Sequence, residues 1–172
     1  MTIHTEATSN SLLLVQTVVF ECETLITYYG TIDDANKYFD GRLHSNSWDD
    51  ATESDKRKAL IMATRAIDRL NFVGSKYSAT QTHEFLRDTE THVPAAIKVA
   101  TYEEALSLLD GIEIEAEKRR LSAISQGFSS VRTTYDRTYV PDHINSGITS
   151  YTAWMHLVPY LRDPNEISLS RV

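Results

Sequence analysis

The most informative stretch of this chain is VPAAIKVATYEEALSLLDG, residues 93–111. Pro94 stands where the first turn of a helix favours proline, and Gly111 stands where a helix favours glycine at its end. The apolar residues between them cover more than half of the helical circumference: Ile97, Val99, Ala100, Tyr102, Ala105, Leu106, Leu108 and Leu109. A helix with this pattern is packed on several sides, so residues 93–111 are predicted to form the central helix of a bundle.

Two helices are predicted upstream of this central helix. The first begins after Thr31, a good N-cap residue, and Asp34 follows three positions later. Its apolar side is formed by Ile32, Ala35 and Phe39, with Leu43 continuing the same spacing. The following residues 46–52 have the composition of a turn, with Trp48 as the predicted anchor in the core.

The second upstream helix is predicted to start after Thr52 or Ser54 and to end near Asn71. Its predicted buried stripe is Ala59, Ala63, Ala66, Ile67 and Leu70, with Leu60 at the border. On the opposite side, Arg65, Asp68 and Arg69 have the spacing that allows ion pairs on a helix surface. A long polar loop, residues 75–91, is predicted to follow, and such loops are often ordered by partners.

Downstream of the central helix, the pattern first remains helical and then changes. Residues 113–124 carry acidic side chains first and basic ones last, which matches the helix dipole, and Glu115 can pair with Arg119. After Gly127, apolar and polar residues alternate, which predicts a β-ribbon or extended arm. Residues 142–150 are predicted to be loop.

The C-terminal part is predicted to contain one short helix and a tail. Trp154, Leu157, Val158 and Leu161 suggest the helix, which Pro159 must end or kink. The predicted fold is therefore mainly α: a small bundle of about four to five helices with a short β-ribbon and an extended tail. The predicted organisation is an N-terminal arm or strand (1–27), a helical core (28–126), a β-arm and loop (127–149), and a last helix with a docking tail (150–172).

Composition narrows the class of protein. The 172 residues are 41% hydrophobic and 24% charged, as in an ordinary globular domain. A net charge of −7 disfavours tight non-specific binding to DNA, because that affinity comes largely from neutralised phosphates. Cys22 is the only cysteine, which excludes an intrachain disulfide. No secretory leader and no apolar run long enough for a bilayer are found, so an intracellular protein without a membrane partner is expected.

No catalytic or cofactor-binding motif is present. The six histidines show neither the paired helical spacing of zinc hydrolases nor a cluster with cysteine. The six glycines are isolated, so no phosphate-binding loop can form, and no nucleophile elbow occurs. We therefore expect a protein that is not an enzyme, with no catalytic residue, no metal and no cofactor.

Two segments could contact nucleic acid. Lys118, Arg119 and Arg120 form a short basic run. On the predicted ribbon, Arg132 and Arg137 alternate with the aromatic residues Tyr135 and Tyr139. Stacking rings interleaved with cations are typical of proteins that bind single strands. The acidic total argues against this interpretation and favours an ordinary surface.

About half of the chain resembles a family of tailed-phage proteins, described either as head-tail adaptor (head completion) proteins or as DnaT-like single-stranded DNA-binding proteins. The resemblance is carried first by Ala35, Tyr38, Phe39, Trp48, the run ATRAIDRLNF (63–72), Gly74 and Lys76. It continues through Gln81, Phe85, Arg87, Val93, Pro94, Ile97, Lys98, Glu103, Ala105 and Leu106, and ends with Leu157, Pro159, Tyr160, Leu161, Arg171 and Val172. The family often has proline where this chain has Leu86.

The adaptor members of this family imply a ring, usually twelvefold, beneath the portal of a virion. The expected partners are the portal protein, the next neck or tail-terminator protein, further copies of the chain, and DNA that passes through the lumen without specific binding. The expected location is the neck of the virion, assembled in the host cytoplasm. Leu161, Arg162, Arg171 and Val172 are the candidate residues for portal docking, and Tyr135, Arg137 and Tyr139 are those for contacts with a neighbouring subunit.

The alternative hypothesis is a DnaT-like protein that binds single-stranded DNA. Its candidate contacts are Lys118, Arg119, Arg120 and Arg132. An unrecognised hydrolase is a third class, and no motif favours it.

Overall fold

The computed structural model describes residues 28–122, 125–128, 131–134 and 140–163. The described helices are α1 (Ile32–Asp40), α2 (Asn46–Asp49), α3 (Glu53–Ile67), α4 (Ala95–Leu109), α5 (Ile114–Ser122), α6 (Asp142–Ser146), α7 (Tyr151–Leu157) and the short 3₁₀ helix η1 (Val158–Tyr160). Two strands, β1 (Ser125–Phe128) and β2 (Val131–Thr134), pair in antiparallel fashion. The predicted class, a mainly helical small domain, is confirmed.

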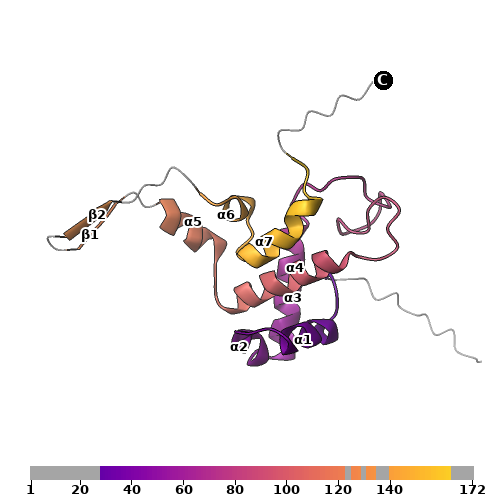
Figure 1. Cartoon of the computed structure of the whole chain (residues 1–172), viewed down its shortest axis with the longest axis horizontal. Helices are drawn as coiled ribbons and strands as arrows, with labels where there is room; N and C mark the ends of the chain where they lie inside the picture. Colours follow the sequence, from indigo (N-terminus) through magenta and orange to yellow (C-terminus); the bar gives the residue numbers. More distant parts are fainter. Residues whose placement is uncertain (1–27, 123–124, 129–130, 135–139, 164–172) are drawn as a thin grey trace, which may run out of the picture.

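Helix α4 is the centre of the body, as its sequence predicts. Helices α3 and α7 both pack extensively on it, and α1 and α2 cover its C-terminal half (Figure 1). One core cluster joins α4 to α3 and α7 through Ile67, Ile97, Ala100, Ala153 and Leu157. The other joins α4 to α1, α2 and α3, and its members include Phe39, Trp48, Leu60, Tyr102 and Leu106. The two clusters together surround most of α4, which explains its apolar circumference.

Most predicted helix starts are confirmed. The Thr31 hydroxyl accepts a hydrogen bond from Asp34 N at 3.1 Å, and Thr52 does the same for Asp55 N at 3.2 Å. Helix α4 begins directly after Pro94 and ends two residues before Gly111, which has a positive φ of 79°. Trp48 is buried, as expected for an anchor. These caps satisfy backbone groups that a helix end would otherwise leave without partners.

Five local predictions are wrong. Residues 46–52 contain the short helix α2, and residues 142–150 contain α6, which closes on Gly147 in the left-handed conformation. Helix α3 ends at Ile67 rather than near Asn71, because the chain turns there to bring Phe72 beside Leu161. Leu43 lies beyond the end of α1 and is exposed. The predicted border residue Leu60 is fully buried.

Glu103 is a buried carboxylate that joins α4 to the end of α1. Its side chain is only 2% exposed and accepts hydrogen bonds from Arg42 Nε at 2.6 Å and Arg42 Nη2 at 2.8 Å. The Tyr38 hydroxyl donates a third hydrogen bond at 2.6 Å. Burial and this bond to Glu103 raise the pKa of Tyr38 to about 12. A bidentate guanidinium is the geometry that best compensates a desolvated carboxylate.

Its neighbour Glu104 joins α4 to the start of α7. The carboxylate accepts hydrogen bonds from Thr149 N, the Thr149 hydroxyl and Ser150 N, at 2.9 to 3.1 Å. Burial raises the pKa of Glu104, although the backbone donors at Thr149 and Ser150 oppose that rise. Because no cation is among these partners, the position of the 149–150 turn depends on backbone N–H groups that need this acceptor.

The polar loop that was predicted to depend on partners is held by the chain itself. Arg87 is buried and donates to the carbonyls of Val73 at 2.8 Å and Gly74 at 2.7 Å, and it pairs with Glu84 at 2.7 Å. The aromatic ring of Phe85 fills the core below it. The Phe85–Leu86 peptide bond is cis. The loop between α3 and α4 is therefore a packed part of the body.

The hairpin of β1 and β2 lies apart from this body. It extends beyond the end of α5, on the left of Figure 1, and neither strand packs extensively on any other described element. The pairing begins with Ser125 opposite Thr134, so β1 starts two residues before the predicted boundary of the arm at 127. Among the described helices, none is long and apolar enough to cross a membrane.

The Arg42–Glu103 pair yields a stability prediction. Arg42→Ala leaves a buried carboxylate without its cation, so we expect the free energy of unfolding in urea to fall by about 2 kcal/mol or more. Arg57→Ala is the matched control, since Arg57 and its partner Glu53 are both exposed, and it should cost about 0.5 kcal/mol or less. Equal losses for the two variants would contradict the role given to Glu103.

Candidate functional site

Asp68, which the sequence predicts to form an ion pair on the helix surface, instead binds groups from two other segments of the chain. Asp68 Oδ2 lies 2.6 Å from His83 Nδ1, and Asp68 Oδ1 accepts a hydrogen bond from Glu84 N at 3.1 Å. The Tyr29 hydroxyl also donates to Asp68 and accepts from Phe85 N at 3.1 Å. The pKa of Tyr29 is raised, mainly because the hydroxyl is buried and secondly because it donates a hydrogen bond to Asp68. Asp68 therefore ties the segment before α1 and the loop after α3 to the body.

This cluster borders a groove of about 760 Å³ between the loop and the start of α1. The lining residues include His83, Tyr77, His92 and Lys98. An aspartate beside a histidine is a common catalytic pair, but here the carboxylate oxygens are used to hold backbone and phenol donors. The described residues contain no group of three or more His, Cys, Asp or Glu side chains arranged to hold a metal ion. The absence of catalysis, metals and cofactors stays a prediction.

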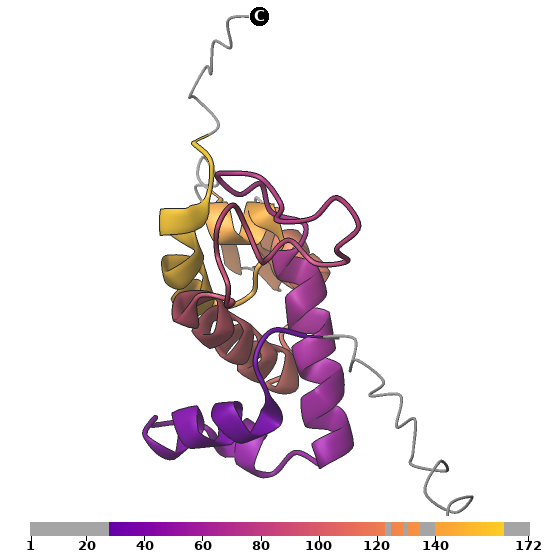
Figure 2. The same cartoon turned by 90° about the vertical axis from the view of Figure 1, so that its right-hand side faces the viewer.

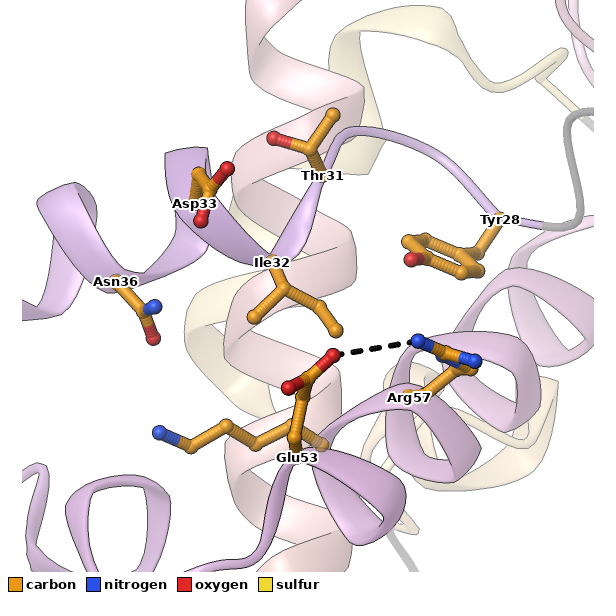
Figure 3. A pocket seen from close by; sticks show the side chains of 8 residues that line it. Tyr28, Thr31, Ile32, Asp33, Asn36, Glu53 and Arg57 are labelled. Carbon is orange, nitrogen blue, oxygen red and sulfur yellow. Dashed lines mark hydrogen bonds and ion pairs between the residues drawn. The ribbon is translucent and has the colours of Figure 1, made fainter. Parts of the chain in front are cut away.

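A second hollow, of about 510 Å³, lies between the starts of α1 and α3 (Figure 3). Its lining is polar, and Figure 3 shows Tyr28, Asp33 and Asn36 around the Glu53–Arg57 ion pair, whose N–O distance is 3.3 Å. The remaining cation, Lys56, lies over the ring of Trp48 at 5.2 Å. The two cations of this hollow, Lys56 and Arg57, thus already have partners, which makes the hollow a poor site for an anion.

The predicted basic run lies on α5, next to the hairpin. Lys118, Arg119 and Arg120 are all exposed, which a contact with DNA requires. Their charges are partly engaged: Arg120 pairs with Glu117 at 2.6 Å, and Lys118 Nζ donates to the Asn145 carbonyl at 3.3 Å. Arg119 Nε donates to the backbone carbonyl of Glu115 at 3.4 Å, so the predicted ion pair between these two side chains is replaced by a backbone contact.

The hairpin carries Arg132 on β2, a short distance along the chain from this run. Tyr135, Arg137 and Tyr139 lie outside the described residues, so their predicted contacts stay predictions. The same holds for Arg171 and Val172. Along the chain, α5, which contacts α6, is followed by the hairpin. We call the described residues of these elements (114–122, 125–128 and 131–134) the arm.

Of the predicted portal-docking residues, the two described ones lie directly after η1. Leu161 pairs with Phe72 in a β-bridge and packs against the core. Arg162 N donates to the Asn71 carbonyl at 2.9 Å, and its side chain is exposed. Leu161 thus packs against the body, whereas the side chain of Arg162 is exposed.

Sequence reasoning missed two exposed apolar surfaces. Met62, Arg65 and Arg69 line a groove of about 480 Å³ along α3, and Tyr151 and Met155 project from α7. The spacing of Tyr151, Met155 and Val158 by four and three residues was visible in the sequence. This exposed row was overlooked because the buried residues of α7, Ala153 and Leu157, also have helical spacing.

The comparisons with known proteins find one match. A model of the family described as "Putative DnaT-like ssDNA binding protein" matches residues 27–170. No curated protein and no solved structure matches the chain. The family description agrees with the second of the two hypotheses drawn from the sequence and does not mention a portal or a virion neck. Because the match covers most of the chain, the chain belongs to this DnaT-like family.

Proposed function

We propose that the chain is a structural subunit of a tailed-phage neck: a head completion adaptor that forms a ring between the portal and the tail-side proteins around the DNA channel. The single observation that carries this proposal is the isolated hairpin of the arm. A two-stranded hairpin without a third strand or a helix beneath it is marginally stable in water. The β1–β2 hairpin, which has no such support from the body, is therefore best explained as an element that packs on another subunit.

The charge distribution supports a structural role rather than strong DNA binding. Seven lysines and arginines of the described residues form ion pairs with carboxylates of the same chain: Lys37, Arg42, Arg57, Lys58, Lys76, Arg87 and Arg120. Such pairs weaken the field that would attract phosphates. An acidic subunit of this kind can line a channel without retaining the DNA that passes through it. The expected partners are the portal, the next neck protein and further copies of the chain, and the expected location is the virion.

The C-terminal tail provides the test of the adaptor role. The described body holds its own end through Leu161, so removal of residues 163–172 should leave the thermal unfolding midpoint nearly unchanged. The truncated protein should no longer join portal-containing heads, because Arg171 and Val172 are lost. Sedimentation of heads with the full-length and truncated chains measures this. Normal head completion by the truncated chain would overturn the docking assignment.

Single-stranded DNA binding is the second candidate function, and the family match favours it. The arm is the surface that fits it best, because Lys118, Arg119 and Arg120 are exposed on α5 beside the strand that carries Arg132. The acidic residues Glu115 and Glu117 on the same helix limit the positive potential there. Binding of single-stranded DNA therefore requires that the local attraction between the cations of the arm and phosphates exceeds the repulsion from a chain with a net charge of −7.

A titration of labelled single strands at two salt concentrations separates the two functions. The adaptor proposal predicts negligible binding, and the same result for a Lys118→Ala/Arg119→Ala/Arg120→Ala variant. Micromolar binding that weakens steeply with salt and is lost in the triple variant would instead establish the arm as a DNA-binding surface. Arg57→Ala is the control, since it removes one exposed cation elsewhere.

A further inference from the structure

A groove along α3 is lined by apolar side chains together with two arginines and three glutamates. Met62 is 54% exposed, Arg65 follows three residues later on α3, and Arg69 lies in the turn just after the helix; all three line the groove. Leu108 at the end of α4 and Ile112 just beyond it add to the apolar lining. The carboxylates that also line the groove are those of Glu104, Glu113 and Glu115. A single exposed methionine would be unremarkable, but here it continues into a hollow that other apolar side chains line.

The two arginines of this groove have no partner among the described residues. Neither guanidinium makes an ion pair or a side-chain hydrogen bond there, unlike Arg42, Arg87 and Arg120 elsewhere on the body. The acidic residue between them in sequence, Asp68, is turned toward Tyr29 and His83 instead. The groove therefore fits a partner that offers apolar side chains together with an aromatic face for a guanidinium.

Helix α7 presents such a set of side chains. Tyr151, Met155 and Val158 are 61%, 54% and 45% exposed and lie on one side at a spacing of four and three residues. The opposite side of the helix, with Ala153 and Leu157, is fully buried in the core. The ring of Tyr151 makes an edge contact with His143 at 5.6 Å, which leaves its other surfaces open. We call these three residues the α7 stripe.

The α7 stripe does not line the groove of its own molecule, although Gly147 and Thr149, just before α7, do. Helices α3 and α7 each pack extensively on α4 but not on each other, and Figure 2 shows them on different sides of α4. Two complementary surfaces that face different directions join copies head to tail. Such an interface closes into a ring when the rotation between successive copies allows it.

We propose that the α7 stripe of one copy docks into the α3 groove of a second copy of this chain. Met155 and Val158 pack against Met62 and Ile112, and the guanidinium groups of Arg65 and Arg69 lie over the ring of Tyr151. This inference deepens the proposed function, on which the closure into a ring rests, but the interface itself is carried by the exposed surfaces of the body.

Mixing of two blocked variants tests the interface. The full-length wild-type chain should self-associate with rising concentration in light-scattering measurements of molar mass. Met62→Asp destroys only the groove, and Met155→Asp destroys only the α7 stripe, so each alone should be monomeric. An equimolar mixture should form a one-to-one dimer and nothing larger, because it contains one intact groove and one intact stripe. Leu43→Asp, at an exposed leucine outside both surfaces, should associate like wild type.

Disulfide trapping identifies the residues that meet. In a Cys22→Ser background, a mixture of Met62→Cys and Met155→Cys chains should form a crosslinked dimer, whereas either chain alone should not. A crosslink with Met155→Cys alone would show a symmetric contact and overturn the proposal. A wild-type chain that stays monomeric at every concentration, or a mixture of blocked variants that stays monomeric, would overturn it equally.

The experiments can refute the interface and the adaptor function independently of each other. A chain that associates head to tail but is absent from phage particles would retain the interface and refute the adaptor function. A virion protein whose Met62→Asp variant still completes heads would refute the interface alone.

Discussion

The structure depends on two adjacent carboxylates that α4 buries in its own packed surroundings. Glu103 is satisfied by Arg42 and Tyr38 at the end of α1, and Glu104 by the backbone at Thr149 and Ser150 before α7. Apolar packing around α4 is non-directional and does not by itself select which segment covers which side. The two carboxylates do determine which segment packs on which side of α4. Without its own partner segment, each would be a buried charge or acceptor that nothing compensates.

A body fixed in this way leaves specific surfaces without a role in its own stability. The packed loop between α3 and α4 is held internally by Arg87 and Asp68, so it is no longer a candidate for ordering by partners. What remains is the arm, the α3 groove and the α7 stripe. Among the described residues, the hairpin packs extensively on no other element, two guanidinium groups of the groove have no partner, and a row of apolar side chains is exposed on the α7 stripe. These three surfaces are consistent with a protein that acts by assembling with other chains.

The sequence predicted the parts of the fold that depend on local chemistry. The caps at Thr31 and Thr52, the start of α4 after Pro94 and the burial of Trp48 each follow from a few neighbouring residues. The burial of Glu103 and Glu104 could not be predicted, since their partners lie more than 40 residues away in the chain. Asp68 was assigned to the surface because its partners Tyr29, His83 and Glu84 lie outside its own helix, 15 to 39 residues away in the chain. The candidate cations of α5 were placed correctly at an exposed position, but their engagement by Glu117 and Asn145 required the structure.

Native-state hydrogen exchange of Glu104→Gln tests the central claim most directly. The amide side chain keeps the volume of glutamate but offers one acceptor oxygen instead of two to the donors at Thr149 and Ser150. The account predicts faster exchange confined to residues 149–157, with α1 and the C-terminal half of α4 protected as in wild type. Unchanged exchange in α7, or a uniform loss of protection across the whole body, would contradict the role of Glu104 as the group that places α7.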